Sequence, residues 1–383
     1  MGLSQNRCDV LVVGGGPAGL AAAIALRQRG FDVLVADALV PPIDKACGEG
    51  IMPDSRRELA HLGVDLADAH GAPFRGIRFC DEGSTASADF PGTPDRPGEG
   101  IGLRRLVLHT LLVDRARDLG VRMCWGTPVT LAPKQAASLV GEPISYRYLI
   151  GADGQSSRVR AWAGLNRGTL QTRRFGSRVH YRIRPWSHYV EVHWGPLGQA
   201  YITPIGDNEV CLAVVTRFPE LARTTRIIDT IPLLREKLRH AEIASRERGS
   251  ITTTRTLRSV VRDNIALVGD ASGSADAVTG EGLAVVFRQA ALLADSIQSG
   301  GLSSYVAGHA RTLRLARTMA RALLLMDRYP ALRRKALQVF AHDEVLFEKL
   351  LRVHLGEEPL NRFVFADAPR LGARMLLPSQ LRS

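Results

Sequence analysis

Residues 9–19 read Asp-Val-Leu-Val-Val-Gly-Gly-Gly-Pro-Ala-Gly, and this stretch decides the fold. Its apolar start predicts a short strand buried on both faces of a parallel sheet. Gly14, Gly16 and Gly19 then form G-x-G-x-x-G. The first glycine permits a tight turn, the second lets the backbone approach a pyrophosphate, and the third lets the next helix pack against the strand. The stretch therefore predicts a dinucleotide-binding turn.

The residues that follow complete a βαβ unit. Pro17 suits the first turn of a helix, where its missing N–H costs nothing, and the helix is expected from Ala18 to about Arg29. A second strand at 32–36 ends at Asp37, 18 residues after the last glycine of the turn. An acid there can accept hydrogen bonds from an adenosine ribose. The unit alone leaves FAD and NAD both open.

Length and composition fit an α/β protein of two intertwined domains. The five cysteines are scattered without a C-x-x-C pair, so we expect neither a disulfide framework nor a metal site. No apolar run reaches the roughly 18–20 residues that span a bilayer, and the N-terminus lacks the layout of a signal peptide. A cytoplasmic location is therefore expected.

The net charge of +12 comes from 50 basic residues, of which only five are lysines. These residues are spread along the chain, and no nucleic-acid module with interleaved aromatics is present. We therefore expect no nucleic-acid partner. Contact with an anionic membrane surface or a carrier protein stays open.

Two later motifs select the cofactor. Residues 148–160 contain Asp153-Gly154 between a strand and a helix start, and residues 264–271 end a strand in Gly269-Asp270-Ala271. Thr-Gly-Glu-Gly-Leu at 279–283 then opens a long apolar helix. With the first turn, these motifs resemble those of the superfamily of aromatic-ring hydroxylases, geranylgeranyl reductases and flavin-dependent halogenases. The resemblance covers residues 7–300 and implies bound FAD.

The resemblance also implies roles for particular residues. The first turn would hold the ADP half of FAD, Asp270 would bind the ribityl chain, and Asp153 would serve FAD and the docking of NAD(P)H. Gly280 and Gly282 would let the flavin ring approach the backbone before a helix N-terminus, whose dipole favours an anionic reduced flavin.

An arginine that precedes a leucine by three positions lies near the cofactor in this superfamily. Arg105 fits that pattern, since Leu108 follows it, and a guanidinium suits phosphate oxygens. Arg104 is the alternative.

The loop at 44–53 is expected to lie against the flavin. It contains Cys47-Gly48-Glu49-Gly50, which resembles a stretch found beside the isoalloxazine in related reductases and hydroxylases. Cys47 and Gly48 are therefore expected near the cofactor. Cys47 and Glu49 are the candidate catalytic residues, and a packing role for Cys47 and an ordinary loop role for Glu49 are the alternatives.

Alternating runs within 74–100 and 173–257 predict antiparallel strands, and in the superfamily two such pieces form one sheet over the flavin. Trp194, Tyr201, His193 and His180 could line a substrate pocket there, although core packing is the alternative for each. We expect a discontinuous Rossmann-like FAD-binding domain at 1–73, 101–172 and 258–300. An antiparallel substrate-binding sheet is expected at 74–100 and 173–257, and a helical C-terminal region at 301–383.

The residue pattern of the C-terminal region predicts a helix with one basic and one apolar face. Its arginines recur every three or four residues, at 311, 314, 317 and 321. A solvated face is one interpretation and contact with an anionic membrane is the other.

The expected reaction is an NAD(P)H- and O2-dependent monooxygenation of a small hydrophobic or aromatic substrate, of the kind met in secondary metabolism, through a C4a-hydroperoxyflavin. Such a reaction requires no side-chain catalyst, because the cofactor carries the chemistry. A geranylgeranyl-reductase-like reduction of a prenyl double bond is the alternative. A halogenase is third, and the Trp-x-Trp-x-Ile-Pro signature is absent. A redox-inert FAD cyclase or a binding protein represents another class.

Overall fold

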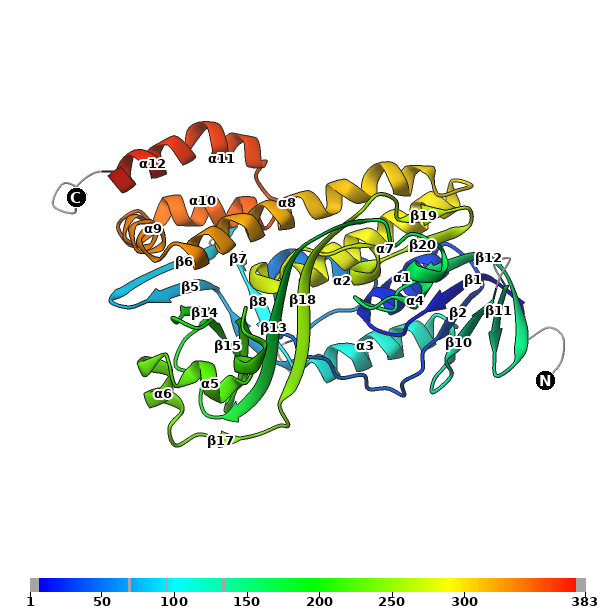
Figure 1. Cartoon of the computed structure of the whole chain (residues 1–383), viewed down its shortest axis with the longest axis horizontal. Coiled ribbons are helices and arrows are strands. Elements are labelled where there is room, and N and C mark those ends of the chain that lie inside the picture. Colours follow the sequence, from blue (N-terminus) through cyan, green and yellow to red (C-terminus); the bar gives the residue numbers. More distant parts are fainter. Residues whose placement is uncertain (1–6, 68–69, 94–95, 133–135, 377–383) are drawn as a thin grey trace.

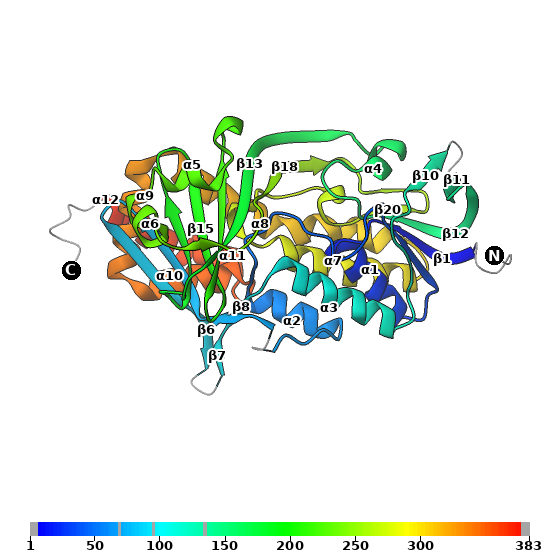
Figure 2. The same cartoon turned by 90° about the horizontal axis from the view of Figure 1, so that it is seen from below.

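A computed structural model describes residues 7–67, 70–93, 96–132 and 136–376. It contains an eight-stranded and a nine-stranded sheet along the long axis of the molecule (Figure 1). The first strand and the last helix lie at opposite ends of that axis in both views (Figures 1 and 2). The predicted α/β class with a Rossmann-like sheet is confirmed.

The eight-stranded sheet is built around the strand that the opening stretch predicts. Strand β1 (Arg7–Val13) pairs in parallel with β2 (Val33–Ala36) and β12 (Glu142–Gly151), and β12 pairs in parallel with β20 (Ile265–Leu267). Val10, Leu11 and Val12 are fully buried, because helices or strands cover both faces. The other strands are β9 (Arg122–Cys124), β10 (Val129–Ala132), β11 (Ala136–Leu139) and β19 (Val261–Arg262).

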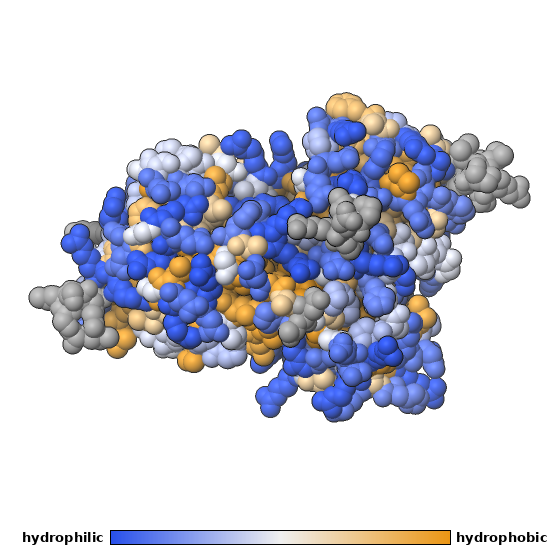
Figure 3. Space-filling view, turned by 180° about the vertical axis from the view of Figure 1, so that it is seen from behind, coloured by the Kyte–Doolittle hydropathy of each residue, from blue (hydrophilic) through white to orange (hydrophobic). Residues whose placement is uncertain are grey.

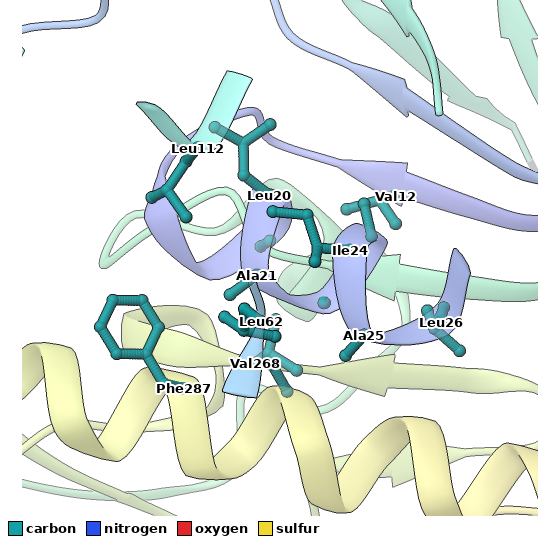
Figure 4. Packing of buried hydrophobic residues seen from close by; sticks show 14 of the residues in the cluster. Val12, Leu20, Ala21, Ile24, Ala25, Leu26, Leu62, Leu112, Val268 and Phe287 are labelled. Carbon is teal, nitrogen blue, oxygen red and sulfur yellow. The ribbon is translucent and has the colours of Figure 1, made fainter. Parts of the chain in front are cut away.

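One face of this sheet carries three long helices. They are α1 (Pro17–Gln28), α3 (Arg105–Asp118) and α7 (Gly282–Gln298). Helix α1 is buried from Gly19 to Leu26, and its alanines let it pack closely against its neighbours (Figure 4). Burial of each large apolar side chain contributes about 1.5–3 kcal/mol. The short helix α4 (Arg158–Trp162) packs in the apolar cluster that contains Leu11 and Leu149.

The nine-stranded sheet joins the two segments that show alternating patterns. Strand β5 (Gly76–Asp81) pairs with β14 (Tyr189–Trp194), about a hundred residues later in the chain. Strands β13 (Gly168–Arg182) and β18 (Arg248–Leu257) form a long pair that extends toward α4 (Figure 2). The domain limits themselves stay a prediction. The other strands are β6 (Ser84–Thr93), β7 (Arg96–Gly98), β15 (Gln199–Gly206), β16 (Glu209–Thr216) and β17 (Glu242–Ile243).

A third sheet has three strands. In the sequence, each of them comes between strands of the two larger sheets. Its strands are β3 (Gly50–Ile51), β4 (Ala72–Phe74) and β8 (Gly100–Gly102), and helix α2 (Pro53–His61) follows β3. The remaining short helices are α5 (Thr224–Ile228), α6 (Pro232–Leu238), η3 (Pro219–Leu221), η4 (Gly269–Ser272) and η5 (Ala277–Thr279).

The C-terminal region is helical, as predicted, up to residue 376, and residues 377–383 lie outside the described part. Its helices pack against β5, β6 and β14 through an apolar cluster that includes Phe79, Trp194 and Phe347. None of the described helices has the length and hydropathy to cross a membrane. The five helices are α8 (Ser303–Arg328), α9 (Pro330–His342), α10 (Glu344–His354), α11 (Leu360–Ala366) and α12 (Ala368–Leu376).

The basic face of α8 contains fewer exposed arginines than its sequence pattern predicts. Arg311, Arg314 and Arg321 are exposed. Arg317 instead turns inward, where its Nη2 donates to the carbonyl oxygen of Arg255 over 2.8 Å. The basic face is therefore shorter than its spacing suggested.

Candidate active site

A cavity of about 1320 Å³ reaches from the glycine-rich turn to the C-terminal helices. Loops at the carboxyl ends of β1, β2, β12 and β20 line one part, which is where α/β sheets bind ligands. The nine-stranded sheet and α8–α12 line the rest. Among the predicted cofactor residues, those in the lining are Gly14, Gly16, Pro17, Ala18, Asp37, Cys47, Gly48, Arg105, Asp153, Gly269, Asp270, Gly280 and Gly282.

The three glycines of the turn have different structural roles. Gly14 has φ of +111°, and a Cβ there would lie 2.5 Å from the carbonyl oxygen of Ala152. A Cβ on Gly19 would lie 1.8 Å from the carbonyl oxygen of Gly14, so Gly19 serves packing and does not line the cavity. A Cβ on Gly16 would meet nothing within 4 Å. The open side of Gly16 faces the space that a pyrophosphate needs.

Asp37 fixes the turn as well as facing the cavity. Its Oδ2 accepts from the N–H of Gly15 at 2.6 Å, and its Oδ1 accepts from the N–H of Leu39 at 2.8 Å. A carboxylate oxygen has more than one lone-pair site, so both oxygens can still accept ribose hydroxyls.

The two neighbouring arginines are clearly distinguished. Arg104 pairs with Glu209, with its Nε 3.0 Å from Oε2. Arg105 lines the cavity, and its Nε is buried with no hydrogen-bond partner. A buried guanidinium N–H without a partner is costly, and a phosphate oxygen would satisfy it. Of the two, Arg105 is the one placed for a cofactor.

The two predicted aspartates differ in their surroundings. Asp153 caps α4, since its Oδ2 accepts from the N–H groups of Arg158 and Val159 at 2.7 and 3.1 Å. Asp270 follows β20 and lies 3.3 Å from Nζ of Lys45, and both side chains are partly exposed. The geometry therefore gives Asp153 a structural role in addition to its place in the lining, and leaves Asp270 as the freer acid.

Glu49 is a paired acid, although it lines the cavity. It has φ of +61°, and its carboxylate is buried. Oε1 accepts from the N–H of Arg105 at 2.9 Å, and Oε2 lies 2.6 Å from Nε2 of His180. Nε of Arg178 lies 3.5 Å from Oε1. These contacts tie the loop to α3 and β13 and leave Glu49 poorly placed for proton transfer to a ligand.

The backbone beside Cys47 is held in the same way. Oγ of Thr203 donates to the carbonyl oxygen of Gly48 at 2.8 Å. Sγ of Cys211 contacts the carbonyl oxygen of Cys47 at 3.7 Å. Both Cys47 and Gly48 line the cavity.

The predicted substrate residues separate into two groups. Tyr201 lines the cavity, and its hydroxyl donates to Oε1 of Gln199 at 2.8 Å. Trp194 packs edge-on against Phe79, with ring centroids 5.1 Å apart, and is not part of the lining. His193 lies 2.9 Å from Glu191, also outside the lining. His180 binds Glu49, as described above. The alternating pattern of β14 predicted that His193 and Trp194 belong to the sheet. It did not indicate which face of the sheet the helices cover.

The part of the cavity farthest from the glycine-rich turn is apolar, and no pattern in the sequence indicated it. We call it the apolar arm and define it by the lining residues of α8–α12. Their contribution is visible only when the helices are packed against the sheet. They are Leu313, Ala316, Met319, Ala322, Leu323, Leu325, Met326, Leu332, Ala336, Phe340, Phe347, Leu350, Leu351, His354, Phe363, Leu371 and Met375.

One titratable pair lies where the arm meets the turn before α7. Nδ1 of His354 lies 3.5 Å from Oε1 of Glu281, and both side chains are at least nine-tenths buried. Burial raises the pKa of Glu281 above its usual value. The sequence predicted the glycines on either side of Glu281 but had no signal for its partner.

Among the residues that the structure describes, two buried clusters combine a cysteine, a histidine and a glutamate. They are Glu49, His180 and Cys211, and Cys80, Glu191 and His193. An arginine contacts each carboxylate: Arg178 contacts Glu49 and Arg78 contacts Glu191. A guanidinium compensates each negative charge, which disfavours a second cation at the same place.

Comparisons with known proteins identify the family. Residues 7–195 match the family described as FAD binding domain. The chain is 30% identical over 329 residues to a menaquinone reductase of Mycobacterium tuberculosis, covering 78% of each protein. This chain belongs to the FAD-dependent oxidoreductases. It is also 27% identical over 300 residues to digeranylgeranylglycerophospholipid reductase 2 of Methanopyrus kandleri, covering 72% of this chain and 73% of that protein.

Solved structures show the same fold for this FAD-dependent oxidoreductase. A flavoprotein/dehydrogenase from Cytophaga hutchinsonii matches with a TM-score of 0.81 at 18% identity, over 96% of this chain and 98% of that one. A triple mutant of the flavin-dependent brominase Bmp2 matches with 0.76 at 16% identity, over 96% and 97%. An oxygenase of 2-methyl-3-hydroxypyridine-5-carboxylic acid matches with 0.65 at 24% identity, over 86% and 91%. The predicted superfamily is confirmed.

The described residues fit FAD, the cofactor of this oxidoreductase. The open side of Gly16 and the unpartnered Nε of Arg105 suit the phosphates. Asp37 suits the adenosine ribose, and Asp270 suits the ribityl chain. Gly280 has φ of +71° and lines the cavity, so the backbone there can lie against a flat ring.

Proposed function

We propose that this oxidoreductase uses reduced FAD to saturate a carbon–carbon double bond in the prenyl chain of a lipid. The apolar arm is the observation that carries the proposal. The cavity of about 1320 Å³ exceeds the roughly 300–1,000 Å³ of a typical ligand site, so a second ligand has room beside FAD. Each buried CH2 group of that ligand would contribute about 0.8 kcal/mol.

The lining of the arm favours a prenyl chain over a small polar substrate. Within the described part of α8–α12, His354 is the one titratable residue of the lining, and the others are aliphatic, aromatic or methionine. Methionine and leucine adapt to an irregular, branched chain. The relatives from Mycobacterium tuberculosis and Methanopyrus kandleri are named as reductases of a menaquinone and a digeranylgeranyl lipid, and both substrates carry prenyl chains.

The reaction is tested with the FAD-loaded enzyme reduced by dithionite without O2. A menaquinone and a digeranylgeranyl phospholipid, each in detergent, are the probes. After reoxidation of any quinol in air, we expect mass spectrometry to detect products whose prenyl chain has gained two hydrogen atoms per saturated bond, with oxidation of the flavin in equal amount. An unchanged mass for both lipids, with the flavin still reduced, would refute the proposal.

Monooxygenation of a small hydrophobic or aromatic substrate, which was expected first, is the second candidate. The apolar lining favours it in one respect, since oxygen transfer requires a site that excludes water. We propose NAD(P)H as the reductant in either case. Bleaching of the flavin by NADH or NADPH under argon tests the reductant. Substrate-dependent O2 consumption with an oxygenated product would support the second candidate over the first.

We further propose that the substrate enters from an anionic membrane surface at α11 and α12. Phe363, Leu371 and Met375 of these helices line the arm, while Phe365 is 81% exposed. An exposed aromatic side chain on a helix that also lines an apolar cavity suits the membrane interface. The positive net charge of +12 supports attraction to anionic headgroups.

A further inference from the structure

The pair formed by His354 and Glu281 is incompletely satisfied. Nδ1 of His354 is 3.5 Å from Oε1 of Glu281, while Nε2 of His354 and Oε2 of Glu281 are buried with no hydrogen-bond partner. A buried polar atom without a partner costs about 1–3 kcal/mol. Two such atoms in one pair point to a ligand or a reaction that uses them.

The pair lies between the two parts of the cavity. Glu281 stands at the N-terminus of α7 between Gly280 and Gly282, both of which line the cavity in the turn expected beside the flavin ring. His354 ends α10 and lines the cavity with Leu350 and Leu351 of the apolar arm. His354 therefore joins the apolar arm to the turn that is expected beside the flavin ring.

Three other titratable residues of the cavity lining are less suited to give a proton. Burial raises the pKa of Tyr201 well above its usual value. Glu49 is paired with His180, and Asp276 is buried against Arg174. His354 has a buried Nε2 without a hydrogen-bond partner at the edge of the arm, which makes it the better placed donor.

We propose that His354, positioned by Glu281, gives the proton that completes reduction of the substrate double bond; this inference rests on the proposed function. The π bond breaks and two C–H bonds form. FAD, once bound and reduced, would supply one hydrogen with the electron pair and be oxidised, while Nε2–H of His354 would supply the other hydrogen as a proton. The imidazole left behind keeps its proton on Nδ1, which faces Glu281, and Nε2 regains a proton from water after the product leaves.

Charged groups on neighbouring elements surround the pair. Arg288 of α7 lies 2.6 Å from Asp54 and 3.4 Å from Glu58 of α2. These contacts leave Arg288 compensated by α2. Glu281 is therefore the acid that faces His354.

The experiment compares His354→Gln and Glu281→Gln in the FAD-loaded protein. With the prereduced enzyme and a prenyl lipid, we expect His354→Gln to slow a single turnover by about 100-fold or more, the usual effect of removing a general acid. Binding of a fully saturated lipid, followed by tryptophan fluorescence, and reduction of FAD by dithionite should stay within about twofold, as expected for a group acting in the transition state. Glu281→Gln should slow turnover less and move the alkaline limb of its pH profile to lower pH.

A second measurement is independent of turnover. In protein with 15N-labelled histidine and oxidised FAD, the ring signals absent from His354→Gln identify His354. We expect the titration midpoint of these signals to move to lower pH in Glu281→Gln, because the carboxylate stabilises the imidazolium. An unmoved midpoint would contradict the positioning role of Glu281.

The matched control is His193→Gln, which removes another buried histidine–glutamate contact, 2.9 Å long, outside the cavity lining. We expect a lower melting temperature and an unchanged single-turnover rate. If His354→Gln keeps the wild-type rate, or His193→Gln slows turnover equally, the inference fails while the proposed function stands. If the wild-type protein itself reduces no prenyl lipid, the proposed function fails.

Discussion

Adjacent arginines on α3 offer the clearest comparison at the scale of single residues. Arg105 has a buried Nε without a partner in the cavity, whereas Arg104 is paired with Glu209. Loss of a charged hydrogen bond costs about 1.5–3 kcal/mol. We therefore expect Arg105→Ala to weaken FAD binding by about 10- to 100-fold. Arg104→Ala should leave it nearly unchanged and cost about 1 kcal/mol of stability or less. Titration of apoprotein with FAD, followed by flavin fluorescence, measures both constants. Equal weakening in the two variants would remove the assignment of Arg105 to the phosphates.

Where the backbone conformation or a close contact allows only one residue type, the position could be predicted from the sequence. Gly14 and Gly19 are required by φ and by close approach, and both follow from the spacing of the turn. The role of Glu49 could not be predicted, because its partner His180 is 131 residues away on another sheet. Trp194 and His193 lie outside the lining of the cavity for a related reason: the alternation of a strand defines two faces but does not say what covers each.

At the scale of elements, α8 and α7 together hold the loop that carries Asp270. Nε2 of His309 on α8 lies 2.9 Å from Oγ of Ser272 in η4, and Gln289 of α7 accepts from the N–H of Gly269 at 2.8 Å. Burial, helped by the charge of Arg317, lowers the pKa of His309 to about 4. A change of pH should therefore act on this junction.

The sign follows from proton binding. Between about pH 6.5 and 4 the unfolded chain binds a proton at His309 that the folded chain does not, so the free energy of unfolding falls as pH falls. The loss through this group is about 2 kcal/mol at pH 5. We expect His309→Gln to make the melting temperature less sensitive to pH between 7 and 5. His342→Gln, at an exposed position on α9, should keep the wild-type sensitivity. Parallel curves for wild type and His309→Gln would contradict the prediction.

Helix α10 provides a test of the apolar arm. Leu350 lines the arm, whereas Val345 on the same helix is 60% exposed. Leu350→Trp should fill part of the arm and raise KM for a long prenyl lipid by about tenfold, roughly the effect of 1.4 kcal/mol of lost binding. A lipid with a single prenyl unit should be affected less, and Val345→Trp should change neither value. Steady-state kinetics with the two lipids measures the difference. An equal rise in KM for both would mean that the arm does not hold the chain.

The position of these helices explains why the arm could not be predicted. Periodicity predicted that residues 301–383 are helical and that α8 has an apolar face, but burial of that face can create a core or leave a cavity. The choice depends on how five helices pack against β5, β6 and β14, with side chains from distant parts of the chain such as Phe79 and Phe347, whose ring centroids lie 5.0 Å apart. The FAD turn is local in sequence and could be predicted, whereas the substrate side is assembled from segments far apart.

At the scale of the whole molecule, the cofactor loops and the proposed entrance are separated along the long axis. Strand β1 lies near one end and α12 near the other (Figure 1). On the opposite face of the molecule, apolar residues are exposed in patches among hydrophilic ones (Figure 3). An arrangement with a lipid entrance at one end requires an orientation on the membrane, and net charge alone does not orient a protein. Specific exposed side chains are needed in addition.

Phe365 of α11 is the side chain best placed to set that orientation. We expect sedimentation of the protein with vesicles to increase with the fraction of anionic lipid and to weaken with salt, because exposed charges are screened within about 8–10 Å at physiological ionic strength. Phe365→Ser should reduce vesicle binding about tenfold. The control is Phe218→Ser, which removes a partly exposed phenylalanine just after β16 and should leave vesicle binding unchanged. Both variants should reduce a prenyl lipid in detergent at the wild-type rate, because neither residue lines the cavity. Binding that ignores anionic lipid would exclude the electrostatic part of the contact, and binding unaffected by Phe365→Ser would place the contact elsewhere on the molecule.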